Sequence, residues 1–515
     1  MRGDAIVMDR TPVILYSLPA ERAESDCACP VGEALPPVLS ALRSGNRFSD
    51  CACPASLPLP DVVMPVAEAA WRSPTDLYRA PLSSDYEVVF RPAGPAGVVV
   101  LGTVARQVLD SFASPRPLDP PSSPPRLPRA AHSIARQLAT LGLLVPTHAT
   151  GHGTCTVHRA LTVWLHLTTR CNLHCAYCYA PRGGKDMHPD VGRAAIDATF
   201  RSALAYGLTV VKIKYAGGEP ALNFSTVRTV HTYARQQAAQ TGVDLHEVLL
   251  SNGVALTGSM MEWLRAEGIR LAISLDGIGP EHDQQRPATR GESTFDAVVA
   301  AIDRAQATGL SPHLSITVTA RNVDNLPEVV AFALDRGLTF HLNFVRPAPG
   351  TPDLIPPTER LIASLQSVAK TLERHPPAER IIDSVLDRCD LGGPHRYPCG
   401  AGRSYLVIDP EGRVARCHME MQAGVGTVWD ENPLKAVRTA DVGVRNPPVD
   451  SKDGCRDCLW RYVCAGGCPL LARRLVGRED VRSPYCQVYR AILPALVRAE
   501  GVRLLKERAE RDRVA

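Results

Sequence analysis

Three cysteines near the middle of the chain have a spacing that suits an iron–sulfur cluster. Cys171, Cys175 and Cys178 form a C-x3-C-x2-C pattern, and Tyr177 stands directly before the last of them. Structural clusters normally take four cysteine ligands. Three thiolates on one short loop would hold three corners of a [4Fe–4S] cube and leave the fourth iron open to another molecule. The alternative is a zinc or structural-cluster site.

A second series of cysteines lies in the last quarter of the chain. A zinc ribbon would account for one closely spaced pair, but seven cysteines in one run indicate a larger metal assembly. The series consists of Cys399, Cys417, Cys455, Cys458, Cys464, Cys468 and Cys486.

Glycine and polar residues follow several apolar runs that read as strands. Gly217 and Gly218 would let the backbone approach a ligand closely, and Glu219 can accept a hydrogen bond from an ammonium group. The alternative is a glycine turn before a helix, or strand-ending turn chemistry at the later positions. Those later positions are Ser251, Asn252, Ser274, Asp276 and Arg286.

The elements that must position these residues alternate regularly from about residue 160. Strands are expected at 162–168, 209–215, 247–251, 271–275, 313–319 and 339–345, with helices at 191–206, 226–240, 258–267, 294–308 and 326–336. Gly242 and Gly337 follow two of these helices, as left-handed caps require. Six strand–helix units predict an α/β fold with a parallel sheet, closed or nearly closed. Active sites gather at the carboxyl ends of such strands, where the three-cysteine loop begins.

Composition limits the class of protein. The 515 residues are 45% apolar and 21% charged, with a net charge of +4 that is too dispersed to indicate a nucleic-acid partner. No run approaches about 18 apolar residues, so no membrane association is expected. Sixteen cysteines without a secretory signal favour metal binding in a reducing cytoplasm over disulfides. We therefore predict a cytoplasmic protein.

The first 150 residues differ from the rest. Residues 1–80 are rich in proline and alanine, and Ser25-Asp26-Cys27-Ala28-Cys29-Pro30 recurs as 49–54 with Cys51 and Cys53. The repeats are exposed turns, a metal site or a contact for a cysteine-containing peptide. Strands are expected at 86–90 and 98–101 and helices at 103–112 and 130–141, around a proline-dense tract at 115–128. Cys155 is expected to be a small buried side chain.

The first cysteine motif and the residues around it resemble those of the radical S-adenosylmethionine (radical SAM) family. The resemblance implies a partial (β/α)6 TIM-like barrel, and a cluster on Cys171, Cys175 and Cys178 that reduces S-adenosylmethionine. It also implies that nine residues line the cofactor site. They are Tyr177, Gly217, Gly218, Glu219, Ser251, Asn252, Ser274, Asp276 and Arg286.

The C-terminal cysteines resemble the SPASM domain, a twin-cluster extension of peptide- and protein-modifying radical SAM enzymes. That likeness implies three [4Fe–4S] clusters in all, with interleaved auxiliary ligands. One auxiliary cluster would take Cys455, Cys458, Cys464 and Cys486. The other would take Cys399, Cys417 and Cys468, with Cys389 as its expected fourth ligand. The auxiliary clusters are either structural or carry electrons from the substrate radical.

The resemblance implies a maturase that abstracts a hydrogen atom from a ribosomally made peptide or protein and forms a C–S or C–C crosslink. An external reductant of the flavodoxin or ferredoxin type is expected. His418 stands where related sulfatase maturases carry a catalytic aspartate, so His418 and the nearby Glu420 are the expected bases. The alternatives are formylglycine-type oxidation of Ser or Cys in a sulfatase, and a non-catalytic iron–sulfur or zinc scaffold.

These expectations give a domain order. It is an irregular region at 1–80, a small winged-helix-like peptide-recognition module at 81–148, a barrel at 158–350, a helical linker at 351–385 and a SPASM extension at 386–500.

Overall fold

The structure is a computed structural model. It describes residues 14–16, 55–56, 70–118, 129–147, 160–347, 352–380 and 382–514. Both Ser-Asp-Cys-Ala-Cys-Pro repeats, Cys155 and residues 119–128 of the proline-dense tract lie outside the described residues. The hypotheses about Cys27, Cys29, Cys51 and Cys53 therefore stay predictions.

Six parallel strands form the body of the largest sheet, in the order β14-β13-β12-β11-β10-β9. They coincide with the six predicted strands, because each is a short apolar run between turn residues. Their bounds are β9 (Ala160–His166), β10 (Val210–Ala216), β11 (Asp244–Ser251), β12 (Arg270–Ser274), β13 (His313–Val318) and β14 (Phe340–Phe344).

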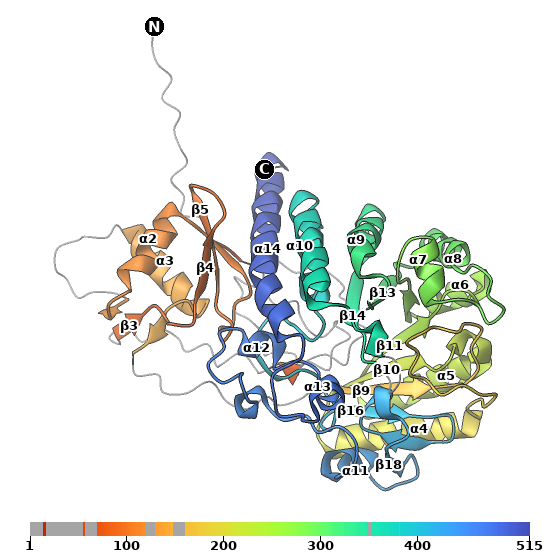
Figure 1. Ribbon diagram of the computed structural model, residues 1–515. Helices are drawn as coiled ribbons and strands as arrows, with labels where there is room; N and C mark the ends of the chain where they lie inside the picture. The colour runs from red at the N-terminus through yellow and green to blue at the C-terminus, as the bar shows by residue number, and fades with distance from the viewer. Residues whose placement is uncertain are drawn as a thin grey trace.

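Helices connect these strands and cover the outside of the sheet (Figure 1). The five predicted helices are present, and the φ angles of Gly242 (70°) and Gly337 (64°) confirm the expected left-handed caps. The helices are α4 (Pro189–Ala205), α5 (Phe224–Thr241), α6 (Gly258–Ala266), α8 (Phe295–Ala307) and α9 (Leu326–Asp335), with a short unpredicted α7 (Pro280–Gln285).

The sheet continues beyond β9 with strands from the C-terminal part of the chain. Strand β16 (Tyr405–Ile408) pairs in parallel with β9, β17 (Arg413–Ala415) pairs antiparallel with β16, and β18 (Gly424–Thr427) pairs antiparallel with β17. The result is an open sheet with β14 and β18 at its edges. The expected parallel sheet is present, but it is open rather than closed, and the strand beside β9 comes from far along the chain rather than from the strand–helix repeat.

Polar and aromatic side chains line the inner face of this sheet. Trp164 on β9 and Lys214 on β10 stand opposite each other in the register, and the Lys214 ammonium lies 5.4 Å from the centre of the Trp164 ring. The alternate residues Ile213 and Tyr215 belong to the hydrophobic core. The period-two alternation of a strand therefore separates the core side of β10 from a polar interior.

The C-terminal third carries helices that pack beside the sheet. Helix α10 (Thr358–Arg374) packs against the long α14 (Cys486–Val514), which begins at the last cysteine of the chain. In the chain, three shorter helices come between α10 and α14 and are joined by irregular segments. They are α11 (Pro433–Thr439), α12 (Arg461–Cys464) and α13 (Pro469–Val476).

The N-terminal elements build two small sheets with their own core. The predicted strands and helices are present as β5 (Tyr86–Phe90), β6 (Val99–Gly102), α2 (Thr103–Ser111) and α3 (Arg129–Thr140). One sheet has the order β1-β6-β5-β4 and the other β7-β3-β8, while β2 pairs with β15. The remaining bounds are β1 (Ile14–Tyr16), β2 (Ala55–Ser56), β3 (Ala70–Arg72), β4 (Tyr78–Pro81), β7 (Arg116–Pro117), β8 (Val145–Pro146) and β15 (His395–Tyr397).

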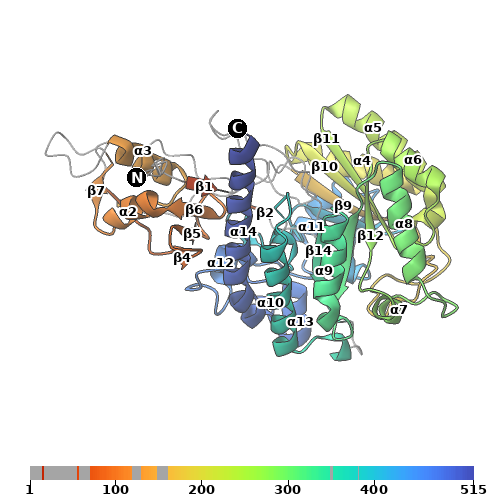
Figure 2. The same ribbon diagram turned by 90° about the horizontal axis from the view of Figure 1, so that it is seen from above.

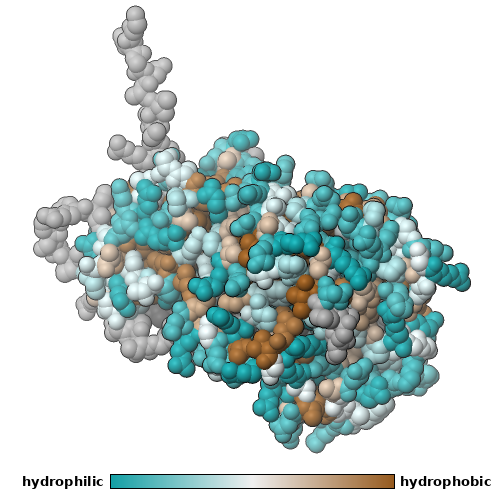
Figure 3. Space-filling model, viewed as in Figure 1, coloured by the Kyte–Doolittle hydropathy of each residue, from teal (hydrophilic) through white to brown (hydrophobic). Residues whose placement is uncertain are grey.

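Helix α14 and helix α10 stand between the N-terminal elements and the parallel sheet, as Figures 1 and 2 both show. The face in Figure 3 is mainly hydrophilic, with apolar side chains in small separate patches. Within the described part of the chain, no helix is both long and apolar enough to span a membrane.

The contact between α14 and the core gives a stability prediction. Leu496 on α14 is fully buried, so Leu496→Ala removes buried methyl groups and leaves a cavity that costs about 2–5 kcal/mol. We expect a lower midpoint of thermal unfolding. Leu204→Ala is the control, because this leucine is 53% exposed. Equal shifts in the two variants would contradict the packing described for α14.

Candidate active site at the three-cysteine loop

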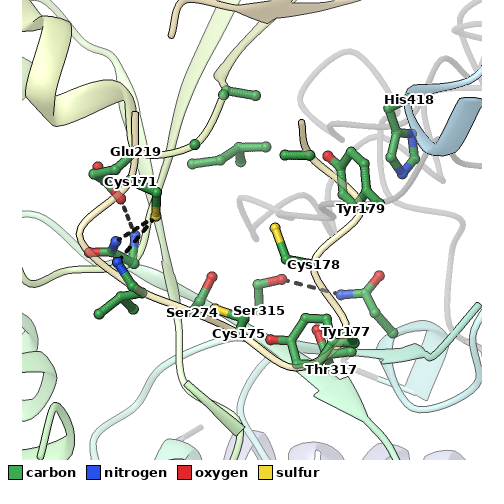
Figure 4. A pocket seen from close by; sticks show the side chains of 18 of the residues that line it. Cys171, Cys175, Tyr177, Cys178, Tyr179, Glu219, Ser274, Ser315, Thr317 and His418 are labelled. Atoms are coloured by element: carbon green, nitrogen blue, oxygen red, sulfur yellow. Dashed lines mark hydrogen bonds between the residues drawn. The ribbon is translucent and has the colours of Figure 1, made fainter. Parts of the chain in front are cut away.

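The three-cysteine loop leaves the carboxyl end of β9 and borders a cavity of about 220 Å³, the central cavity. This cavity lies between the loop, the carboxyl ends of the parallel strands and residues 418–419. Cys171, Cys175 and Cys178 all line it, and Figure 4 shows their side chains around one open space. The sequence placed these cysteines at the end of the first strand, and the structure brings all three thiols to one cavity.

The paired glycines hold the base of this loop. The N–H of Gly218 donates to the carbonyl of Thr168 at 2.8 Å, and the N–H of Glu219 donates to that of Arg170 at 2.8 Å. A Cβ atom on Gly218 would lie 2.1 Å from the Arg170 carbonyl oxygen. Gly218 therefore allows two backbone segments to touch, and it lines the central cavity as well.

Glu219 is fully buried and anchors the same region. Its carboxylate accepts hydrogen bonds from the N–H groups of Ala221 (3.0 Å) and Asn252 (2.7 Å) and from the Ser251 hydroxyl (2.9 Å). It caps a short 3-10 helix, η1 (Pro220–Asn223). Burial raises the pKa of Glu219, and the hydrogen bonds oppose that effect. The carboxylate that is predicted to accept a hydrogen bond from a ligand ammonium also fixes the ends of β10 and β11 and borders the central cavity.

Asp276 has a different place from the one that the sequence predicted. It is fully buried, it accepts hydrogen bonds from the Tyr177 hydroxyl, from Arg286 Nε (2.7 Å) and from the Thr317 N–H (2.8 Å), and it does not line the cavity. Arg286 in turn places Nη1 3.9 Å from the sulfur of Cys175. Asp276 thus positions the two side chains that flank a cysteine of the loop.

The other eight residues that were predicted to bind the cofactor do line the central cavity. Asn252 Nδ2 donates to Asn172 Oδ1 at 2.7 Å and lies 3.9 Å from the Cys171 sulfur, so it also steadies the loop. Ser274 stands at the carboxyl end of β12 beside the cavity.

Several lining residues were not singled out from the sequence. The signal that marks them is their inward position near the carboxyl ends of strands, where side chains at every second residue face the interior. They include Trp164, Ser315, Thr317 and Asn343, together with Tyr179 of the cysteine loop and Arg388.

His418 lies at the wall of the cavity opposite Cys171. Its ring stacks on Trp164 with centroids 4.3 Å apart and an interplanar angle of 8°, and its Nδ1 is 2.9 Å from the Tyr405 hydroxyl. Figure 4 shows Tyr179 beside it. Glu420, the second expected base, does not line the cavity and forms an ion pair with Arg473. Of the two expected bases, only His418 therefore faces the cavity that the three cysteines border.

The C-terminal cysteines separate into two groups. Cys399, Cys417 and Cys468 surround a second small cavity, the side cavity. The other four lie close together, and the charges of neighbouring thiols in this group raise the pKa values of Cys455, Cys464 and Cys486, in addition to the larger effect of burial. The four are Cys455, Cys458, Cys464 and Cys486.

Cys389 does not join the group around the side cavity. The thiol with the largest influence on its pKa, after burial, is Cys464, and Cys389 does not line the side cavity. Its predicted role as a fourth ligand beside Cys399, Cys417 and Cys468 stays a prediction. The spacing of ten residues between Cys389 and Cys399 could not reveal the direction of the intervening turn.

Buried cations accompany both groups. Arg346 Nε lies 3.4 Å from the sulfur of Cys468, and Arg346 also pairs with Asp387. Burial raises the pKa of Cys468, but the charges of Arg346 and Arg388 outweigh burial and lower it. Lys452 is 2% exposed, and burial lowers its pKa, while the charges of thiols from both groups act to raise it. Positive charge inside the protein thus lies where thiolates would need it.

The two cavities share a wall. Arg346, Arg388, His418 and Met419 line both of them. All eleven cysteines in the described residues are free thiols, and they are the eleven that the sequence predicted as metal ligands. Within those residues no three His, Cys, Asp or Glu side chains converge on a point that would suit one metal ion. A cubane has a separate iron for each ligand and does not require such convergence.

Residues 165–333 match the family model described as the Radical SAM superfamily. These residues form a radical SAM domain. The protein is a radical SAM enzyme, and such a domain implies a [4Fe–4S] cluster with S-adenosylmethionine. The three thiols around the central cavity fit such a cluster, since they reach one open space from one loop.

Relatives of this radical SAM enzyme include peptide maturases. It is 29% identical to the mycofactocin maturase of Mycolicibacterium smegmatis over 348 residues, which cover 62% of this chain and 81% of the relative. It is 26% identical to the PqqA peptide cyclase of Xanthomonas campestris over 352 residues, covering 64% and 88%. The solved structure of native anSMEcpe with bound AdoMet has a TM-score of 0.54 at 16% identity, covering 66% of this chain and 100% of that one. That structural likeness supports the fold.

The close approach at Gly218 yields a testable prediction. Gly218→Ala should displace the cysteine loop, because its Cβ would collide with the Arg170 carbonyl. We expect formation of 5′-deoxyadenosine from S-adenosylmethionine to fall about a hundredfold, as measured by chromatography. Gly258→Ala is the control, because no atom lies within 4 Å of its Cβ position. Wild-type activity of Gly218→Ala would show that the loop does not depend on this contact.

Proposed function

We propose that this radical SAM enzyme is a maturase that forms a C–S or C–C crosslink in a ribosomally made peptide. The observation that carries the proposal is the shared wall between the two cavities. The central cavity borders the three-cysteine loop, and the side cavity borders Cys399, Cys417 and Cys468. A substrate carbon in the central cavity would lie near both cysteine sites.

The names of two relatives, a mycofactocin maturase and a PqqA peptide cyclase, support a peptide substrate. We propose that Cys171, Cys175 and Cys178 hold the cluster and that Gly217 and Gly218 border the S-adenosylmethionine site. When bound, these groups supply an adenosyl radical that removes a hydrogen atom from carbon. The side chains around the cavity position the target carbon and keep water out.

We propose a SPASM-type extension with two auxiliary clusters. Cys455, Cys458, Cys464 and Cys486 would hold one, and their mutual proximity supports that set. The other would have the three ligands around the side cavity. Because Cys389 lies toward Cys464, we propose that the fourth corner of this site opens on the side cavity.

His418 is the proposed proton acceptor. Burial lowers its pKa well below the ordinary value, so the imidazole is neutral and can accept the proton that leaves as a bond forms. Its stacking on Trp164 and its contact with the Tyr405 hydroxyl fix the ring at the cavity wall.

Residues 81–148 are proposed to recognise the precursor peptide in the manner of a winged-helix module. Support comes from a separate hydrophobic core, which includes Val89, Leu101, Leu109, Ile134 and Leu138. A unit with its own sheet and core can present a binding edge while the barrel does the chemistry. A one-electron carrier of the flavodoxin or ferredoxin type is the proposed reductant.

Anaerobic reconstitution tests the cluster assignment. We expect about twelve irons per chain and 5′-deoxyadenosine in the presence of S-adenosylmethionine and reductant. The triple variant Cys171→Ala, Cys175→Ala, Cys178→Ala should retain about eight irons and lose cleavage. Bound zinc in place of iron would instead support a non-catalytic scaffold, and loss of all iron in the triple variant would refute the proposed sets of ligands.

Substitution of His418 tests the reaction. His418→Ala should keep deoxyadenosine formation but reduce crosslinked product by about a hundredfold, since general bases contribute factors of this size. Mass spectrometry of the precursor peptide measures the loss of two hydrogens on crosslinking. Formylglycine in the product would support sulfatase-type oxidation in place of crosslinking. An equal fall in 5′-deoxyadenosine and in crosslinked peptide would instead show that His418 contributes to binding of the cofactor.

A further inference from the structure

The group of Cys455, Cys458, Cys464 and Cys486 lies closer to the surface than the other C-terminal cysteines. Cys458 and Cys486 are partly exposed, whereas Cys399 and Cys468 are buried and the partly exposed Cys417 lines the side cavity. An electron that leaves the interior through cysteine sites would therefore reach the surface here.

Exposed arginines surround this place. Arg482 and Arg490 both lie close enough to Cys486 to lower its pKa, and Arg456 directly follows Cys455 in the chain. Arg490 stands four residues after Cys486 in α14, so the two share one face of the helix. The backbone N–H of Arg482 donates to the carbonyl of Asp453 at 2.9 Å, which holds this arginine beside the Cys455 loop.

These exposed arginines are not paired with acidic side chains of the described residues. Arg456, Arg482 and Arg490 form no ion pair with any described residue, whereas the nearby Arg478 pairs with both Asp453 and Asp480. The exposed Asp457 lies beside Cys458, and Asp453 and Asp480 are the two acids that pair with Arg478. The four arginines therefore outnumber these three carboxylates, and a positive face attracts a negative partner and speeds its encounter.

We propose that the face formed by Arg456, Arg482 and Arg490 docks an acidic one-electron carrier protein beside Cys458 and Cys486. This proposal rests on the proposed function, because crosslinking oxidises the substrate radical. Each new bond releases one proton, which goes to the base at the cavity wall, and one electron. The oxidised carrier accepts that electron through the four-cysteine site and becomes reduced by one electron.

A binding experiment with the reconstituted enzyme tests the docking face. The probe is an oxidised flavodoxin of net negative charge, whose flavin fluorescence reports binding and, in stopped flow, the association rate. In the variant Arg482→Glu/Arg490→Glu we expect the dissociation constant to rise at least about tenfold at low salt, mainly through slower association. High salt should weaken binding of the wild-type enzyme in the same direction.

Two matched variants separate this site from general charge effects. Arg265→Glu/Arg304→Glu makes the same charge change on exposed arginines of α6 and α8, far from α14 in Figure 1, and should leave binding within about twofold. Arg482→Lys/Arg490→Lys keeps the charge and should also bind as the wild type does. Equal weakening in both Glu variants, or none in either, would overturn the proposal, as would binding that does not respond to salt.

A second readout distinguishes this inference from the proposed function. Iron content and the spectrum of the reduced auxiliary clusters are recorded for each variant. Normal iron together with binding that is insensitive to Arg482→Glu/Arg490→Glu refutes the docking face alone. Absence of auxiliary iron in the wild-type enzyme refutes the proposed clusters and, with them, electron transfer at this face. Weakened binding with normal iron and slower flavin reduction supports both.

Discussion

Sulfur inside this protein requires positive charge or N–H groups beside it, because a buried thiolate without such partners is unstable. The structure meets that requirement separately at each cysteine site. Arg286 lies beside Cys175 and Arg346 beside Cys468, while Lys452 lies between the two C-terminal groups. These cations are themselves buried and are held by acids or carbonyls. Asp276, for example, accepts a hydrogen bond from Arg286 Nε and so holds this cation in place.

The sequence was a good guide to the strands and helices and a poorer one to the roles of single residues. The six parallel strands could be predicted because each is a local apolar run. Strand β16 could not, since its partner β9 lies over two hundred residues earlier. Asp276 looked like a ligand at a strand end, but the Thr317 N–H and the Tyr177 hydroxyl occupy its oxygens. Contacts of this kind depend on three-dimensional register, which spacing alone does not reveal.

The inner face of the sheet links the three-cysteine loop to the C-terminal cysteines. Trp164 on β9 stacks on His418, which follows Cys417 directly in the chain. The parallel sheet and the C-terminal segment therefore share one wall through a stacked pair of rings, and Tyr405 of β16 adds a hydrogen-bonding contact to the same histidine. The arrangement makes the C-terminal part of the chain a component of the cavity rather than an appendage.

The pairing of β16 with β9 also bears on how the protein is made. While the ribosome is still producing the segment after β14, one side of β9 has no strand beside it, and an unpaired strand edge can capture other chains. The edge is covered only when Tyr405–Ile408 has emerged. The nascent chain thus passes through a long interval with an open sheet, so chaperone binding and timely cofactor delivery would affect yield before any question of activity arises.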